Sequence, residues 1–211
     1  MDPDAVEIRV LGCLIEKQRT TPDAYPLTLN SLRLACNQST NRDPVLALGE
    51  SEIRAALERL GRRRWTRLAS WSSGRSMKYR HLLDETLGLD GPQLSLLAVL
   101  MLRGPQTPGE LRQRTERLHR FGEAELDEAI AALEGRELVR QLPRRPGQRE
   151  QRYEQLLGEG AAPGPVAEAA APAVEESAPP PDGLPERVAQ LERELASVRD
   201  ELRTLREELG A

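Results

Sequence analysis

Arginine side chains are concentrated at two places in this chain, each next to a predicted β-hairpin. Guanidinium groups bind phosphate oxygens through paired hydrogen bonds, so arginines on exposed elements are candidates for contact with a nucleic-acid backbone. The complete set of candidate nucleic-acid-binding residues is Arg54, Arg59, Arg62, Arg63, Arg64, Arg67, Arg75, Lys78, Arg144, Arg145, Arg149 and Arg152. The alternative is a solvated surface on which the stems of these side chains cover apolar residues.

Residues that could carry out catalysis or bind a metal are few and scattered. The two histidines, His81 and His119, and the two cysteines, Cys13 and Cys36, show no metal-ligand spacing. No glycine-rich phosphate loop follows a predicted strand, and no serine lies in a nucleophile-elbow pattern. Both cysteines lie in apolar helical patterns, which predicts buried free thiols. We therefore expect a protein that is not an enzyme and that has no cofactor and no metal site.

Two stretches of the chain repeat at a nearly constant distance. Residues 60–67 align with residues 133–140 at an offset of 73, and residues 77–83 align with residues 151–157 at an offset of 74. Each copy has the pattern of a helix end, a strand, a turn and a returning strand that ends in Tyr-x-x-Leu-Leu. Two copies are too few for a solenoid, so the repeat predicts a duplicated small domain. Three helices followed by a hairpin is the winged-helix plan, and the expected fold class is mainly α with small antiparallel β-hairpins (α+β).

In the first half, apolar spacing predicts three helices and then a hairpin. Thr28 is expected to cap the second helix, because its hydroxyl can accept a hydrogen bond from the first turn. The polar loop 37–44 is either a binding site or a turn whose side chains cap neighbouring helices, and the second role is the commoner one. The expected helices are residues 4–18, 29–36 and 51–60, and the expected strands are residues 65–71 and 77–82.

The second half has clearer helix signals. Pro92 suits the first turn of a helix that has almost no polar face, so this helix is expected to be buried between the halves. Thr107 and Glu110 have the spacing of a capping box for the next helix. A third helix is expected after Gly122. The expected strands of the second hairpin are residues 138–142 and 150–156.

The C-terminal part of the chain differs in composition from the rest. Residues 159–183 are rich in alanine, proline and glutamate, which predicts a disordered linker. In residues 184–211, apolar positions alternate spacings of four and three, which predicts a parallel coiled coil and therefore a homodimer. The alternative is a single amphipathic helix that docks on its own body. The predicted dimerisation positions are Leu184, Val188, Leu191, Leu195, Val198, Leu202, Leu205 and Leu209.

These patterns divide the chain into four predicted segments, and the first two segments carry nearly balanced charge. The predicted segments are winged-helix domain 1 at 1–88, winged-helix domain 2 at 89–158, the linker at 159–183 and the dimerisation helix at 184–211. Residues 1–90 carry 14 basic and 12 acidic side chains, and residues 91–158 carry 11 and 10, so the folded part has no strong field that would attract phosphate. No apolar run of about 18 residues is present. The first residues are unlike a signal peptide, and we expect a cytoplasmic protein without membrane association.

Long irregular strings of this chain resemble the bacterial YceH-like family of tandem winged-helix proteins. The matching strings include residues 9–17, 35–38, 41–45, 102–112 and 146–150, and the match extends over about residues 5–157. The family pattern has Lys-Ser where this chain has Ser39 and Thr40, and it tends to have histidine where Glu154 stands. The resemblance implies the tandem winged-helix fold, and it implies no particular activity.

Winged-helix domains most often bind DNA, with the third helix in the major groove and the hairpin on the phosphates. In the second half, glutamate and aspartate dominate the exposed face of this helix, which opposes such a use. Six aromatic residues leave no stacking platform for single strands. We expect a dimeric regulatory protein that binds double-stranded DNA with its first half and its arginine-bearing hairpins. The alternative is a scaffold that binds a protein partner through its acidic faces, without DNA.

Overall fold

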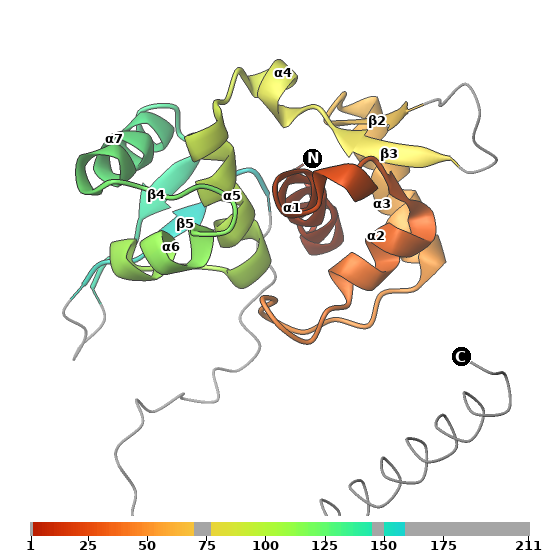
Figure 1. Ribbon diagram of the computed structural model, residues 1–211, viewed down its shortest axis with the longest axis horizontal. Coiled ribbons are helices and arrows are strands. Elements are labelled where there is room, and N and C mark those ends of the chain that lie inside the picture. Colours follow the sequence, from red (N-terminus) through yellow and green to blue (C-terminus); the bar gives the residue numbers. More distant parts are fainter. Residues whose placement is uncertain (1, 70–76, 145–149, 159–211) are drawn as a thin grey trace, which may run out of the picture. The chain divides into compact units, whose positions relative to one another are not determined.

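The computed structural model describes residues 2–69, 77–144 and 150–158, which belong to one compact unit (Figure 1). The predicted linker at 159–183 and the predicted dimerisation helix at 184–211 lie outside the described residues. Helices with small antiparallel sheets make up the fold, so the expected α+β class is confirmed. None of the helices in the described part of the chain has the length and apolar character needed to cross a bilayer.

The first half of the chain forms three helices and a small antiparallel sheet with the strand order β1-β3-β2. α1 begins with a capping box, in which the Asp4 carboxylate accepts from the Glu7 N–H at 2.8 Å and the Asp4 N–H donates to Glu7 at 3.1 Å. The Thr28 hydroxyl accepts from the Ser31 N–H at 3.2 Å, as expected for an N-cap. The elements are α1 (Ala5–Thr20), the 3-10 turn η1 (Pro22–Ala24), β1 (Leu27–Thr28), α2 (Leu29–Cys36), α3 (Glu50–Arg62), β2 (Thr66–Ala69) and β3 (Lys78–His81).

The short helix α4, which the apolar spacing did not predict, ends the first half and is followed by the helices of the second half. The capping box of α6 is present: the Glu110 N–H donates to the Thr107 hydroxyl at 3.2 Å, and the Thr107 N–H donates to the Glu110 carboxylate at 2.9 Å. The elements are α4 (Leu83–Leu87), α5 (Gly91–Arg103), α6 (Pro108–Thr115), α7 (Glu123–Glu134), β4 (Val139–Gln141) and β5 (Tyr153–Gln155). β4 and β5 form a two-stranded antiparallel sheet.

The sequence repeat has a counterpart in the backbone of the two halves. Tyr79 in β3 pairs with Leu27 of β1, and Tyr153 in β5 forms an antiparallel bridge with Gln106. A second match lies in the turn after the third helix, where Arg64 has a φ of 60° and the residue 73 positions later, Glu137, has a φ of 56°. Left-handed backbone is uncommon outside glycine, so its recurrence at equivalent positions indicates the same local turn in both halves.

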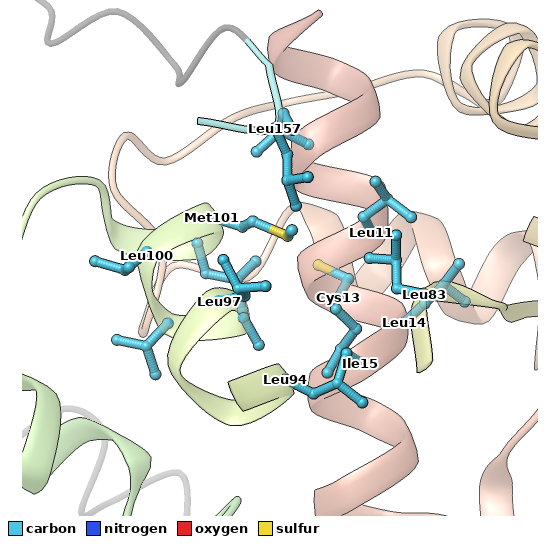
Figure 2. Packing of buried hydrophobic residues seen from close by; sticks show 14 of the residues in the cluster. Leu11, Cys13, Leu14, Ile15, Leu83, Leu94, Leu97, Leu100, Met101 and Leu157 are labelled. Atoms are coloured by element: carbon cyan, nitrogen blue, oxygen red, sulfur yellow. The ribbon is translucent and has the colours of Figure 1, made fainter. Parts of the chain in front are cut away.

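Helices α1 and α5 pack against each other and join the two halves. The nine consecutive residues Leu94–Leu102 of α5 are buried, as its apolar sequence predicts. Figure 2 shows Leu97 and Met101 of α5 facing Cys13 of α1. The helices approach closely at Gly12, where an added Cβ would lie 2.9 Å from Leu102 Cγ. Because α1 also packs against α2 and α3, it is part of one core that extends through both halves.

Hydrogen bonds to side chains of α1 fix the polar loop 37–44. The Arg42 guanidinium is fully buried and donates to the Glu16 carboxylate at 2.6 Å. Arg9, which is 1% exposed, donates to the carbonyl oxygens of Cys36 at 3.1 Å and Pro44 at 2.6 Å. Burial of a cation is costly unless its donors are paired, and here both terminal nitrogens of Arg9 donate to backbone carbonyls while its Nε has no partner in the described residues. These side chains hold the loop on α1.

Candidate nucleic-acid interface

Helix α3 is amphipathic and turns charged side chains away from the core. Its buried side chains are those of Ile53, Ala56, Leu57 and Leu60. Arg54 and Arg62 on α3, Arg64 in the next turn and Arg67 in β2 are exposed, and none of their side chains bonds to another described residue. We call these four residues the arginine surface. Guanidinium groups that are not paired within the protein are available to an external anion.

Two further candidates, Arg59 and Arg63, are engaged within the protein. Arg59 contacts the carboxylates of Asp4 at 2.5 Å and Glu7 at 3.1 Å, and its hydrogen bond with Glu7 raises the pKa of the Arg59 guanidinium. Arg63 lies 3.8 Å from Glu7, with its guanidinium 5.9 Å from the centre of the Trp65 ring. Both arginines tie the C-terminal part of α3 to the start of α1, which gives them a structural role.

The corresponding segments of the two halves differ in charge. Residues 50–67 contain six basic and three acidic side chains, a net charge of +3. Residues 123–140, which lie 73 positions later, contain two basic and six acidic side chains, a net charge of −4. On α7, Glu123, Asp127 and Glu128 are all exposed. Only the first half therefore offers phosphate a favourable surface at its third helix.

The first hairpin adds fewer available cations than its sequence suggests. Arg67 lies opposite Arg80 in the β2–β3 register, and Arg80 contacts the Glu85 carboxylate at 2.7 Å. Lys78 is half-buried in β3. Arg75 lies outside the described residues. Among Arg67, Lys78 and Arg80, only Arg67 is exposed.

The second hairpin is described only in part. Arg144 is exposed and bonds to no other residue of the described ranges. The Arg152 guanidinium donates to the Pro105 carbonyl at 3.1 Å and lies 3.9 Å from Glu110, so it braces the start of α6 against the hairpin. The remaining two candidates, Arg145 and Arg149, lie outside the described residues.

The titratable residues that could do chemistry are buried or dispersed. Burial lowers the pKa of His81 to about 4, and its ring nitrogen Nε2 lies 2.6 Å from the Gln18 side-chain oxygen. The neutral imidazole donates in that bond, because an amide oxygen can only accept. Cys13 and Cys36 are free thiols in the core. Across the described ranges, no group of three or more histidine, cysteine, aspartate or glutamate side chains could hold a metal ion.

These observations define an α+β protein with two related helical halves and an unpaired arginine surface on the first. The chain belongs to the family described as "Protein of unknown function, DUF480", which matches residues 4–148. This is the YceH-like family that the sequence resembles, and that expectation is confirmed.

Several relatives carry the name UPF0502 protein. The protein from Geotalea uraniireducens is 53% identical over 155 residues, which cover 72% of this chain and 70% of the relative. The protein from Geobacter metallireducens is 48% identical over 202 residues, with 91% and 88% covered. The protein from Shewanella amazonensis is 45% identical over 200 residues, with 91% and 95% covered. These names describe no activity.

Proposed function

We propose that this protein is a dimeric, non-enzymatic regulator made of two winged-helix domains, and that its first half binds double-stranded DNA. The observation that supports this proposal most directly is the charge difference between equivalent segments, +3 for residues 50–67 and −4 for residues 123–140. The positive segment also carries the four unpaired arginines of the arginine surface. A duplicated domain with only one cationic copy favours docking through that copy.

In the proposed complex, the arginine surface contacts DNA in two ways. Arg54, on the exposed face of α3, reaches a base edge in the major groove, where a guanidinium can bond two acceptors of guanine. Arg62, Arg64 and Arg67 follow at the end of α3 and in β2, and they contact phosphate oxygens. On the second half, the exposed Arg144 and its hairpin neighbours grip phosphates further along the duplex.

Salt dependence of DNA binding tests the arginine surface. Fluorescence anisotropy with a random duplex is measured over a series of salt concentrations for the full chain and for Arg62→Gln/Arg64→Gln. Each lost phosphate contact lowers the slope of log K against log salt by about 0.9, so the double variant should lose about 2. The matched control is Arg112→Gln/Arg120→Gln, which removes two exposed arginines of the second half. Equal losses in both variants, or no complex at micromolar protein and low salt, would overturn the proposal.

The hairpin of the second half has its own test. Arg144→Ala/Arg145→Ala/Arg149→Ala should weaken duplex binding without changing the thermal unfolding midpoint, because Arg144 is exposed and bonds to no described residue. Unchanged duplex affinity would remove this hairpin from the proposed interface.

Dimerisation through residues 184–211 is part of the same proposal. The heptad positions Leu184 to Leu209 would form the seam, and the linker at 159–183 would let two DNA-binding halves reach neighbouring sites. Deletion of residues 159–211 should convert a dimer into a monomer in sedimentation velocity. An unchanged mass would place the dimer contact in residues 1–158.

A second candidate is a scaffold for a basic protein partner, and the exposed carboxylates of α7 favour it. Glu123, Asp127 and Glu128 form an acidic face that would repel DNA and attract lysine and arginine side chains. This hypothesis requires no affinity for duplex DNA. This hypothesis would be contradicted if the chain formed a saturable complex with duplex DNA and Arg62→Gln/Arg64→Gln weakened that complex.

A further inference from the structure

A polar cavity of about 710 Å³ lies between elements of the two halves. The C-terminal part of α1 and the loop 37–44 contribute one side, and α5 with α6 and the turn after it contribute the other. This volume is within the range of cavities that hold small molecules. The hydrogen bond from Arg103 to the Asn41 side chain links the two sides within this lining.

The lining of the cavity has more positive than negative charge. Its cations are Lys17, Arg103, Arg114 and Arg117, and its carboxylates are those of two glutamates. Arg117 is exposed and bonds to no other described residue. Four cations against two carboxylates leave a net charge of +2 in the lining, so the cavity favours an anion over a cation.

Both carboxylates of the lining are already paired. Glu16 contacts the buried Arg42 at 2.6 Å and Lys17 at 3.5 Å. Glu116 contacts Arg120 at 3.1 Å, and Arg120 is not part of the lining. Among the described residues, neither glutamate forms an ion pair with Arg103 or Arg117.

Arg103 is a partly buried cation of the lining that has no carboxylate partner among the described residues. Burial lowers the pKa of its guanidinium, and the positive charges of Arg114 and Arg42 lower it further, while the carboxylates of Glu16 and Asp43 act in the opposite direction without reversing the shift. No carboxylate of the described ranges forms an ion pair with Arg103, whose side chain instead donates a hydrogen bond to the neutral Asn41 side chain. An anion placed beside Arg103 would offset both the burial and the repulsion between these cations.

The other lining residues restrict the kind of anion. Hydroxyl and amide groups of residues such as Thr20, Thr40 and Gln113 offer hydrogen bonds to a polyhydroxylated molecule. No aromatic side chain is among the lining residues, so a nucleobase would find no ring on which to stack. Arginine forks match the geometry of phosphate oxygens. We propose that this cavity binds a phosphorylated, non-aromatic small molecule of the sugar-phosphate class. The site is separate from the arginine surface and does not depend on DNA binding.

Isothermal titration with fructose 1,6-bisphosphate as the probe tests this site on the full chain at constant ionic strength. We expect one molecule to bind per chain, and we expect Arg103→Gln and Arg117→Gln each to weaken binding about tenfold or more, the scale of one lost charge-assisted contact. Arg54→Gln is the matched control, because Arg54 is exposed, unpaired among the described residues and absent from the lining. The Arg54→Gln chain should bind the probe with the same affinity as the unaltered chain.

A second set of measurements separates a lost site from a disturbed fold. Replacing Arg103 also removes the bond to Asn41, whereas Arg117 makes no such bond, so the Arg117→Gln chain should retain its circular dichroism spectrum and unfolding midpoint. Fructose and citrate are titrated in parallel, and we expect neither to bind comparably. Absence of probe binding at millimolar concentration, or undiminished binding by both cavity variants, would overturn the site. Citrate binding of equal strength would overturn its assignment to phosphate.

Discussion

Replacement of Gly12 by alanine tests the close packing of α1 on α5. The new Cβ would lie 2.9 Å from Leu102 Cγ and 3.0 Å from Met101 Cβ, whereas relaxed carbon contacts are about 3.5–4.0 Å. Leu102 and Met101 are 3% and 4% exposed, so neither can move into solvent. Overpacking of this kind costs about 1–3 kcal/mol. Removal of a helical glycine returns about 0.5–1 kcal/mol. The expected result is a net loss of up to about 2.5 kcal/mol in the free energy of unfolding.

Gly61 in α3 provides the matched control for this prediction. Its added Cβ would meet no atom within 4 Å, so Gly61→Ala keeps the helix-propensity gain without the overpacking. The two variants should differ by about 1–3 kcal/mol in favour of Gly61→Ala. Urea unfolding of the full chain, with the m-value checked for each variant, measures the difference. If Gly12→Ala were as stable as Gly61→Ala, the close contact between α1 and α5 would be refuted.

Two further predictions concern buried polar side chains. Arg42→Met should lower the free energy of unfolding by about 3–5 kcal/mol, because it removes the buried guanidinium that Glu16 contacts at 2.6 Å and leaves the more distant Lys17, at 3.5 Å, as the cation beside that carboxylate. Arg42→Met/Glu16→Met should recover part of that loss in urea unfolding, and a double variant no better than the single one would contradict this account. His81 has a pKa of about 4 in the folded chain and an ordinary value of 6.5, so the unfolded chain binds the extra proton between these values. Stability from His81 is therefore complete above pH 6.5 and falls by about 3 kcal/mol as the pH drops to 4, a loss that His81→Gln should lack; parallel pH profiles for both chains would contradict a buried neutral imidazole.

The helices and their caps were predictable because local signals determine them. Thr28 and Thr107 cap the helices at which their sequence patterns placed them. The apolar run of α5 predicted its burial, although no local signal identified α1 as the helix that packs against it. Gly12 is one glycine inside a helical pattern, and only the approach of α5 gives it a role.

The candidate site was less predictable, because an arginine has the same sequence signature whether it is free or paired. Arg59 and Arg62 lie three positions apart on α3, yet Arg59 reaches Asp4 and Glu7 across a long sequence separation while Arg62 remains exposed. The cavity brings Glu16 and Arg103 into one lining, and no periodicity within one element predicts such a meeting. Buried Arg9 left one signal, a cation within an otherwise apolar stretch of α1.

The position of α1 between its own helices and α5 has a consequence for any attempt to isolate one half. A fragment that ended at residue 88 would lack α5, so the side of α1 around Gly12 and Cys13 would be exposed to water. In the full chain, leucine and methionine side chains of α5 cover this side. Such a fragment is expected to self-associate or precipitate, since a large apolar patch is unstable in solution. The two copies therefore cannot be handled as independent modules.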